Sequence, residues 1–289
     1  MSDDRVNILI TGAGGYIGQQ LSSLLSNVGH NVSTHYRQRP AYSPCSDVLF
    51  GDLRHCRDFI LRSYDLIIHA AATSPGATTN MSRFVEDNIL SSQALFDTAI
   101  ERGCDRIILL SAISVFGEAR SANVDENTPC RNPDDYGLSK RVCERLLEER
   151  QNQISGLTLR LPGILGQNAR TPWLARVRNA FRVGEPVSAY APTAPFNNAL
   201  HVEDLSRFIQ KVCRSTDKPY DMVTLAAEGY MTIRESLEKL HCDIKSTSSI
   251  SFHQSEKSTF TISIEKARQI YGFAPMHVRD TLGRFAIEP

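Results

Sequence analysis

The sequence predicts an α/β protein in which a parallel β-sheet carries helices on both faces. Two observations predict this fold. Apolar strand-like runs alternate with helical patterns through the first half of the 289-residue chain, and such alternation produces a parallel sheet of buried strands. A glycine-rich segment, residues 11–18, joins the first of these strands to the first helix.

The spacing of apolar residues predicts each element in order. Strands are expected over residues 6–11, 31–36, 47–50, 65–70, 106–111 and 157–161. Helices are expected over residues 16–28, 84–102, 136–151 and 202–212. After about residue 166 the pattern changes, because prolines at positions 172, 186, 192 and 195 interrupt it. We therefore expect a first domain over residues 1–166, to which residues 200–213 could return, and a smaller lobe over residues 167–289.

The glycine-rich segment reads Thr-Gly-Ala-Gly-Gly-Tyr-Ile-Gly. Glycines at positions 12, 15 and 18 permit a tight turn, a close approach of the backbone to a pyrophosphate, and close packing of a helix on a strand. The N-terminus of the following helix offers free N–H groups and a positive dipole end to the diphosphate. The motif predicts a Rossmann dinucleotide-binding domain over residues 1–166, and an ordinary glycine-rich turn is the alternative.

Composition argues against several other classes of protein. The chain has 32 basic and 32 acidic residues, so we expect no nucleic-acid partner. Its seven cysteines form no CxxC pair, which fits a reducing cytoplasm and argues against a metal site or a disulfide framework. The sequence has no apolar run of membrane-spanning length and its first residues are polar, so we expect a cytoplasmic protein with no membrane partner.

Tyr136 and Lys140 form a second chemical motif. They lie four residues apart in an expected helix, so they share one face. A phenol has a pKa of about 10, and a nearby cation favours the phenolate. Lys140 is therefore expected to lower the pKa of Tyr136, which becomes a candidate proton donor or acceptor at a carbonyl–alcohol pair. A solvated helix face is the alternative interpretation.

The end of the second expected strand favours NADP(H), although NAD remains possible. An NAD-selective site places Asp or Glu about 20 residues beyond the glycines. No carboxylate occurs between Arg5 and Asp47. Arg37 and Arg39 lie at and just after the strand end, where a guanidinium can meet a 2′-phosphate, and His35 could add a weaker contact. Both arginines could instead be solvated loop charges.

Taken together, these motifs make the chain resemble the extended short-chain dehydrogenase/reductase family, which includes nucleotide-sugar epimerases, dehydratases and reductases. The matching segments are 11–18, 51–53, 69–72, 111–117, 136–140, 160–166, 201–204 and 267–275. The resemblance implies that Asp52 and Leu53 flank the adenine, although Asp52 could be only a turn former. The residues expected to bind the dinucleotide are Gly12, Gly15, Tyr16, Ile17, Gly18, Arg37, Arg39, Asp52, Leu53, Ala70, Ala71, Ala72, Tyr136, Lys140 and Pro162.

One catalytic position departs from the family pattern. The resemblance implies a Ser or Thr five residues before Gly117, but the chain has Ala112 there. Since strand side chains alternate between faces, Ser114 would share a face with Ala112 while Ser111 points away. Ser114 is therefore the preferred catalytic and substrate-orienting hydroxyl, and a strand-end serine without catalytic function is the alternative. Related 4,6-dehydratases carry an Asp-Glu pair where this chain has Ile113 and Ser114, which argues against dehydration.

The substrate site is predicted from the resemblance alone. Gly163 replaces an Asn that often meets the nucleotide sugar, and Asn197 and Asn198 lie where the chain returns toward the site. These asparagines could donate to a sugar or phosphate oxygen, or simply form a turn. In relatives the diphosphate binds in the segment that contains Arg170, Arg176, Arg178 and Arg182.

The expected function is that of an NAD(P)-dependent oxidoreductase acting on a nucleotide sugar. The small second lobe favours a keto-sugar nucleotide reductase, and a nucleotide-sugar C4 epimerase is the alternative. A non-catalytic dinucleotide-sensing protein is a third possibility, favoured by Ala112 and Gly163 and opposed by Tyr136 and Lys140. The resemblance also implies a homodimer, paired through helices 84–102 and 136–151.

Overall fold

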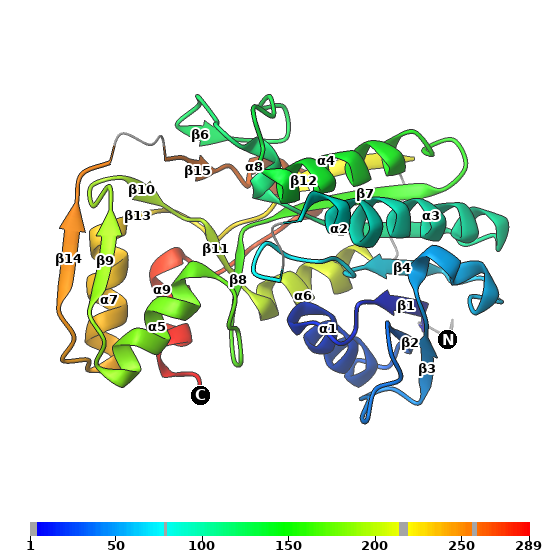
Figure 1. Cartoon of the computed structure of the whole chain (residues 1–289), viewed down its shortest axis with the longest axis horizontal. Helices are drawn as coiled ribbons and strands as arrows, with labels where there is room; N and C mark the ends of the chain where they lie inside the picture. The colour runs from blue at the N-terminus through cyan, green and yellow to red at the C-terminus, as the bar shows by residue number, and fades with distance from the viewer. Residues whose placement is uncertain (1–4, 78–79, 214–218, 256–258) are drawn as a thin grey trace. The chain divides into compact units, whose positions relative to one another are not determined.

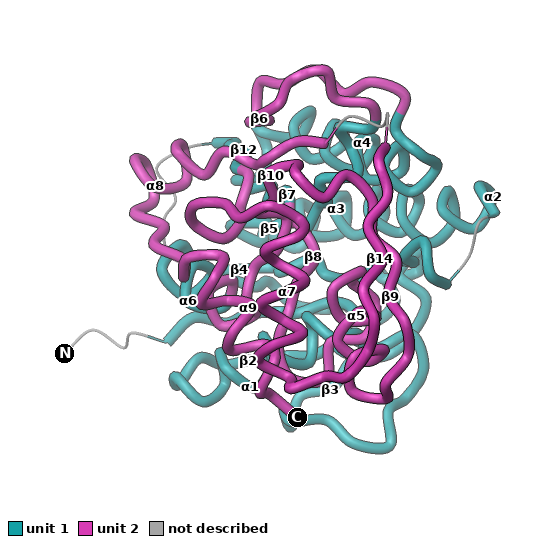
Figure 2. The backbone as a smooth tube through the Cα atoms, turned by 90° about the vertical axis from the view of Figure 1, so that its left-hand side faces the viewer, with its two compact units in different colours: residues 1–117, 133–160, 206–223 teal, residues 118–132, 161–205, 224–289 magenta. Residues whose placement is uncertain are grey.

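A computed structural model describes residues 5–77, 80–213, 219–255 and 259–289 of the chain. The chain forms two compact units, shown in two colours in Figure 2. Unit 1 comprises residues 1–117, 133–160 and 206–223, and unit 2 comprises residues 118–132, 161–205 and 224–289.

These borders differ from a single break at residue 166. The chain leaves unit 1 after Gly117, returns at Pro133 and crosses again after Arg160. Residues 206–223 belong to unit 1, which overlaps the return expected for residues 200–213. The excursion over residues 118–132 was not predicted, because its only strand, β6 (Asn123–Val124), is too short to show a periodic pattern.

Unit 1 is built on a seven-stranded sheet of the Rossmann type, which confirms the predicted fold class. The strand order is β12 (Tyr220–Thr224), β7 (Ser155–Leu161), β5 (Arg106–Ala112), β4 (Leu66–His69), β1 (Asn7–Thr11), β2 (Asn31–Tyr36) and β3 (Asp47–Phe50). The five strands from β5 to β3 pair in parallel. The chain runs outward from β1 in both directions, so the topological switch point lies between β1 and β4, where doubly wound sheets bind ligands.

Alternating strand residues bury both faces of this sheet. On one face Leu9, Ile67 and Leu109 pack in a core cluster with side chains of α3 (Ser91–Glu101) and α4 (Asp135–Glu148). Ile8 and Ile10, which point to the other face, are fully buried. Figure 1 shows α1 (Tyr16–Asn27) on that side of the sheet. Helices on both faces explain why the strands are apolar throughout.

The helix expected over residues 84–102 consists of three segments. They are α2 (Met81–Phe84), the π-helical η2 (Val85–Leu90) and α3. Four apolar residues of this helix, which the resemblance places in a dimer interface, are buried in unit 1 itself: Phe84, Leu95, Phe96 and Ala99. A π-helical turn adds an extra residue to a helix and often marks a functional site, and η2 supplies Asp87 to the site described below.

Unit 2 contains four two-stranded sheets and several helices. The sheets pair β10 (Pro195–Phe196) with β13 (Met231–Thr232), β11 (Ala199–His201) with β8 (Gly163–Leu165), β14 (Ile250–His253) with β9 (Val187–Tyr190), and β15 (Thr261–Ile262) with β6. The helices are α5 (Trp173–Val183), α7 (Ile233–Ile244), α8 (Glu265–Tyr271) and α9 (Val278–Ile287). Helix α6 (Val202–Val212) begins in unit 2 and ends in unit 1.

Two features are absent from the described part of the chain: a membrane-spanning helix and a metal-binding cluster. No helix within residues 5–77, 80–213, 219–255 and 259–289 is both long and apolar enough to cross a bilayer. The same residues contain no group of three or more His, Cys, Asp or Glu side chains arranged to hold a metal ion.

Candidate active site

The glycine turn after β1 leaves no room for a side chain at Gly12 or Gly18. Gly12 has φ +71°, and a Cβ built on it would lie 2.6 Å from Ala71 Cα. A Cβ on Gly18 would lie 2.3 Å from the Gly12 carbonyl oxygen. Gly15 forms the N-cap of α1 and has no side chain with which to cap the first turn. The turn therefore brings the backbone close to any ligand and leaves helix N–H groups available to a phosphate.

A pocket of about 330 Å³ opens beside this turn, at the carboxyl ends of β1, β2 and β4. It lies at the switch point of the sheet, where a dinucleotide binds in such folds. The expected cofactor residues that line it are Gly12, Gly15, Arg37, Asp52, Leu53, Ala70, Ala71 and Ala72. Because the turn excludes a Cβ at Gly12 and Gly18 and faces a pocket of this size, the residues present fit a nicotinamide dinucleotide.

The other expected cofactor residues do not line this pocket. Tyr16, Ile17 and Gly18 form the first turn of α1 behind it. Arg39 places its guanidinium over the Phe50 ring, 4.7 Å from the ring centroid, and its phosphate contact stays a prediction. Pro162 belongs to unit 2.

Asp52 is held by its neighbour Arg54. The Asp52 carboxylate caps η1 (Leu53–Asp58) by accepting from the Arg54 backbone N–H at 2.9 Å, and the guanidinium of Arg54 lies 2.6 Å from it. The side-chain hydrogen bonds from Arg54 lower the pKa of Asp52 to about 2. Asp52 thus forms the turn and also lines the pocket. Its contact with the adenine stays a prediction.

His35 does not act as a cation in this pocket. Its ring stacks on Phe59 with centroids 5.3 Å apart, and its Nε2 lies 3.0 Å from the Gly51 carbonyl oxygen. Burial lowers the pKa of His35 to about 4, so the ring is neutral near pH 7. The weaker phosphate contact expected of His35 therefore cannot be an ionic one.

Tyr136 and Lys140 lie one turn apart on α4, as predicted. Asp134 caps this helix by accepting from the Gly137 N–H at 2.7 Å. A Cβ on Gly137 would lie only 2.2 Å from the Ser114 carbonyl oxygen, so the helix approaches that backbone closely. The Tyr136 ring lies 5.9 Å from the Phe84 ring, and Lys140 Nζ donates to the Leu110 carbonyl at 2.8 Å.

The prediction that Lys140 lowers the pKa of Tyr136 was wrong. Burial, assisted by Asp134, raises the pKa of Tyr136 to about 12. Burial also lowers the pKa of Lys140. Desolvation therefore outweighs any help that Lys140 gives to the phenolate, and Tyr136 holds its proton at neutral pH.

The prediction that Ser114 shares a strand face with Ala112 was also wrong. Strand β5 ends at Ala112, and Ile113–Phe116 form a 3₁₀ turn, η3, so alternation of faces does not extend to Ser114. Ser111 does point away into the core, where its hydroxyl donates to Glu144 at 2.6 Å. Ser114 is half-buried, and its carbonyl accepts from the Gly117 N–H at 3.2 Å.

Unit 2 has a smaller pocket of about 250 Å³ that contains two of the expected substrate residues. Gly163 and Asn198 line it together with Trp173 and Phe196, whose rings meet edge to face at 6.0 Å. The Asn198 Oδ1 atom is buried and has no hydrogen-bond partner among the described residues. A buried acceptor of this kind suits a ligand that donates a hydrogen bond.

Asn197 does not serve the substrate site. Its Oδ1 accepts from the Ile262 N–H at 2.8 Å, and its Nδ2 donates to the Ile262 carbonyl at 2.8 Å. Both the oxygen and the nitrogen of the Asn197 side-chain amide thus bind the backbone of Ile262. The substrate contact predicted for Asn197 is therefore wrong.

The arginines expected at a diphosphate also have structural partners. Arg178 is buried and donates to the Phe285 carbonyl at 3.1 Å, and Arg182 donates to the Ala286 carbonyl at 3.2 Å. Arg176 donates to the Thr171 carbonyl at 2.8 Å. Two of these side chains, Arg178 and Arg182, therefore hold the C-terminal helix α9, although the family resemblance had suggested a diphosphate site in this segment.

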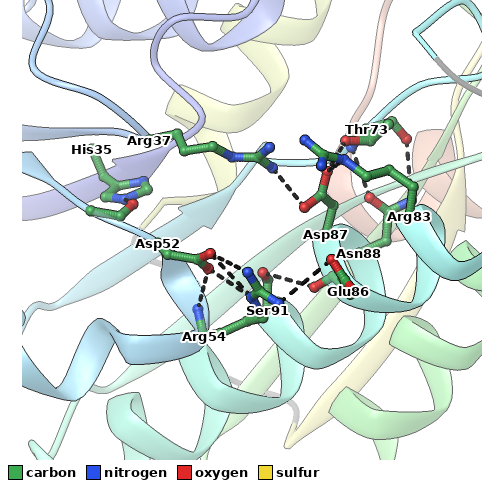
Figure 3. Close-up of polar contacts among 11 residues, drawn as sticks. His35, Arg37, Asp52, Arg54, Thr73, Arg83, Glu86, Asp87, Asn88 and Ser91 are labelled. Atoms are coloured by element: carbon green, nitrogen blue, oxygen red, sulfur yellow. Dashed lines mark hydrogen bonds and ion pairs between the residues drawn. The ribbon is translucent and has the colours of Figure 1, made fainter.

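The sequence did not predict Asp87 and Ser91, which line the unit 1 pocket from η2 and α3. Figure 3 shows Asp87 between the guanidinium groups of Arg37 and Arg83. The available signal was the run Glu86-Asp87-Asn88 within an otherwise apolar helical pattern. Asn88 accepts from the Thr73 backbone N–H at 2.8 Å, and its Nδ2 donates to Ser139 at 2.9 Å.

A parallel sheet with a glycine turn and a pocket at its switch point defines a dinucleotide-binding α/β protein, and a Tyr–Lys pair lies on α4 of the same unit. The sequence profile of the NAD dependent epimerase/dehydratase family matches residues 8–226. The chain therefore belongs to the NAD dependent epimerase/dehydratase family.

Individual relatives are more distant. A UDP-glucose 4-epimerase of Streptomyces lividans is 27% identical over 154 residues, covering 48% of this chain and 46% of the relative. A D-erythronate dehydrogenase of Cupriavidus necator is 27% identical over 213 residues, covering 66% and 65%. The chain thus spans about half the length of the first relative. The solved structure of MoeE5 in complex with UDP-glucuronic acid and NAD has a TM-score of 0.83 at 23% identity, covering 97% of both chains, a likeness of fold.

Proposed function

We propose that this chain is an NAD(P)-dependent oxidoreductase that reduces a keto-sugar nucleotide. The observation that carries the proposal is the position of Tyr136, a half-buried phenol one helical turn before Lys140 in the unit that holds the dinucleotide-type pocket; burial raises its pKa to about 12. A phenol that keeps its proton at neutral pH suits the acid that a ketone oxygen needs during reduction. The substrate class is carried over from the nucleotide-sugar relatives.

The chain's own residues would act as follows. The Gly12–Gly18 turn and the first N–H groups of α1 would hold the diphosphate, and Asp52 and Leu53 would flank the adenine. Lys140, fixed by the Leu110 carbonyl, would place a cation on the Tyr136 face of α4. Tyr136 Oη would give its proton to the substrate oxygen, with Ser114 as the orienting hydroxyl. When bound, the nicotinamide would supply the hydride chemistry.

We also propose NADP(H) as the preferred dinucleotide. Strand β2 and the residues after it carry no carboxylate before Asp47, and Arg37 lies on the pocket wall. The nearest functional alternative is a C4 epimerase, which is favoured by the epimerase relative and needs the same Tyr136. A sensor without turnover would be favoured by Ala112 and Gly163.

An absorbance assay tests the proposal. The purified chain is mixed with NADPH or NADH and a panel of nucleotide sugars and their 4-keto forms, and products are separated by chromatography. We expect one reduced dinucleotide consumed per hydroxyl product. An isomerised sugar with no net change in dinucleotide would instead identify an epimerase. Dinucleotide binding without any conversion would identify a sensor.

Two further expectations concern the whole protein. We propose a cytoplasmic homodimer that pairs through η2–α3 and α4, each of which exposes a leucine: Leu90 is 43% exposed and Leu138 is 41% exposed. A twofold pairing of identical surfaces is the commonest oligomer. Light scattering should give a dimer mass that Leu138→Glu reduces to that of a monomer, and a monomer mass for the unmodified chain would refute the pairing.

A further inference from the structure

Asp87 lies between two guanidinium groups at the wall of the unit 1 pocket (Figure 3). Its side chain is only 6% exposed. Arg37 Nη2 lies 3.0 Å from one carboxylate oxygen, and Arg83 Nε lies 2.8 Å from the other. The Thr73 hydroxyl donates to this second oxygen at 2.6 Å.

The Asp87 carboxylate is ionised at neutral pH. Burial acts to raise its pKa, but the hydrogen bond from Thr73 and the Arg37 guanidinium outweigh burial, and the pKa is lowered. Both Asp87 and Arg37 line the pocket, whereas Arg83 does not. On the pocket wall that would face the ribose 2′ position, the negative charge of Asp87 therefore lies beside the positive charge of Arg37.

Asp87 has partners besides Arg37. The Arg37 side chain is 52% exposed, and ion pairs with such exposed groups are weak. If Arg37 turned to another anion, Asp87 would still have Arg83 and Thr73 as partners. Arg37 can therefore exchange partners without leaving a buried carboxylate unpaired, which would be costly.

We propose that Asp87 sets the dinucleotide preference of the pocket by competing with the 2′-phosphate of NADP(H) for Arg37. The proposal rests on the proposed function, in which Arg37 receives that phosphate. While Asp87 is charged, the phosphate must displace a carboxylate from Arg37 and approach a second negative charge. A dinucleotide with a free 2′-hydroxyl meets neither obstacle. Asp87 thus makes the difference between the NADP(H) and NAD(H) affinities smaller than it would be if Arg37 had no competing carboxylate.

Equilibrium titration of the full chain with NADPH and with NADH, by calorimetry, tests this competition. Asp87→Asn should tighten NADPH binding about threefold to fivefold, the upper range for removing one competing ion pair with a solvent-exposed guanidinium, and should leave the NADH affinity within about twofold. Arg37→Ala should weaken NADPH and remove most of the gain from Asp87→Asn in the double variant. Arg83→Gln is the matched control, because it loses a pair with the same carboxylate away from the pocket.

Several outcomes would overturn the proposal. If Asp87→Asn weakens NADPH as much as Arg37→Ala does, Asp87 anchors Arg37 instead of competing for it. An unchanged NADPH affinity would remove Asp87 from specificity altogether. Should Asp87→Asn fail to fold, the double variant Arg83→Gln/Asp87→Asn, which keeps the local charge balanced, is titrated against Arg83→Gln with the same expectations.

The proposed function can fail separately. If Arg37→Ala leaves both affinities unchanged, the NADP(H) assignment is wrong and Asp87 has no phosphate with which to compete. If Arg37→Ala weakens only NADPH while Asp87→Asn changes nothing, the assignment stands and only the role of Asp87 is refuted.

Discussion

The pocket of unit 1 and the pocket of unit 2 are built in different ways. The first surrounds a glycine turn and gathers residues from five segments between Gly12 and Ser91. The second draws on two segments, 163–174 and 196–198, and includes the rings of Trp173 and Phe196. The glycine turn itself is encoded within a few consecutive residues, so sequence analysis finds the first pocket through that turn, whereas the second pocket has no such local signal. Variants that affect dinucleotide binding and substrate binding separately test whether the two pockets have different roles.

The largest effect is expected at Tyr136. Tyr136→Phe should lower turnover about 10³-fold, because it removes the proton donor, while the glycine turn and its pocket stay intact. Steady-state rates with the substrate found in the panel assay measure the loss. Tyr220→Phe is the matched control, since it removes a phenol that donates to Thr158 at 3.2 Å and should retain near-normal rates. Comparable losses in both variants would show a general effect on folding.

The next effect concerns the glycine turn. Gly18→Ala should weaken dinucleotide binding at least tenfold, because its Cβ would lie 2.3 Å from the Gly12 carbonyl. Gly14→Ala is the control within the same turn, since its Cβ would lie 3.5 Å from the Tyr36 side chain, an ordinary contact. Calorimetric titration measures both variants. Tighter binding by Gly18→Ala than by Gly14→Ala would contradict the close packing of α1 on β1.

Acid should destabilise unit 1 through a buried histidine. His69 lies between Thr11 at 2.7 Å and Ser92 at 2.9 Å, and burial lowers its pKa to about 3. Between pH 6.5 and 3 the unfolded histidine is protonated while the folded one stays neutral. The free energy of unfolding should therefore fall by about 1.4 kcal/mol for each pH unit below about 6.5.

Urea unfolding at pH 7, 6 and 5 measures this dependence. His35, whose pKa burial lowers to about 4, adds a slope of the same sign. His69→Asn should reduce the dependence of the unfolding free energy on pH by about 1.4 kcal/mol per pH unit, the contribution of one proton. The exposed His253→Asn should not change this dependence. Equal slopes for His69→Asn and the unmodified chain would contradict the neutral, buried state of His69.

The smallest effect separates two adjacent asparagines of unit 2. Asn198→Ala should raise the KM for the substrate about fivefold and leave dinucleotide affinity unchanged, because Asn198 Oδ1 offers an unused buried acceptor. Asn197→Ala should instead lower the free energy of unfolding by about 1–3 kcal/mol, because it leaves the Ile262 backbone groups unpaired. Equal KM values for the two variants would remove Asn198 from the substrate site.

Six strands of the unit 1 sheet, β1–β5 and β7, and the glycine turn could be predicted because their signals are local. Residues 107–110, for example, are apolar throughout, and the structure has β5 at Arg106–Ala112. Ser114 was misplaced because the sequence gives no sign that β5 ends at Ala112 and a 3₁₀ turn begins. Asn197 and Arg178 were misassigned because their partners, Ile262 and Phe285, lie 65 and 107 residues away along the chain.

Asp87 shows a different limit. Its place at the pocket depends on η2, a π-helical turn that helical periodicity does not distinguish from an α-helix. The raised pKa of Tyr136 was likewise beyond sequence analysis, because it comes from burial by residues far apart in the chain. Sequence spacing showed that Tyr136 and Lys140 share a face, but only the three-dimensional structure shows how much water surrounds them.

The most direct test of the account follows the hydride itself. The chain is incubated with the keto-sugar nucleotide and NADPH that carries deuterium at both C4 positions of the nicotinamide, and the product is analysed by mass spectrometry. We expect one deuterium on the new carbinol carbon of each product molecule, and no deuterated product when Tyr136→Phe replaces the unmodified chain. A keto-sugar nucleotide that the unmodified chain leaves unreduced, or a reduced product free of deuterium, would contradict the proposed reduction.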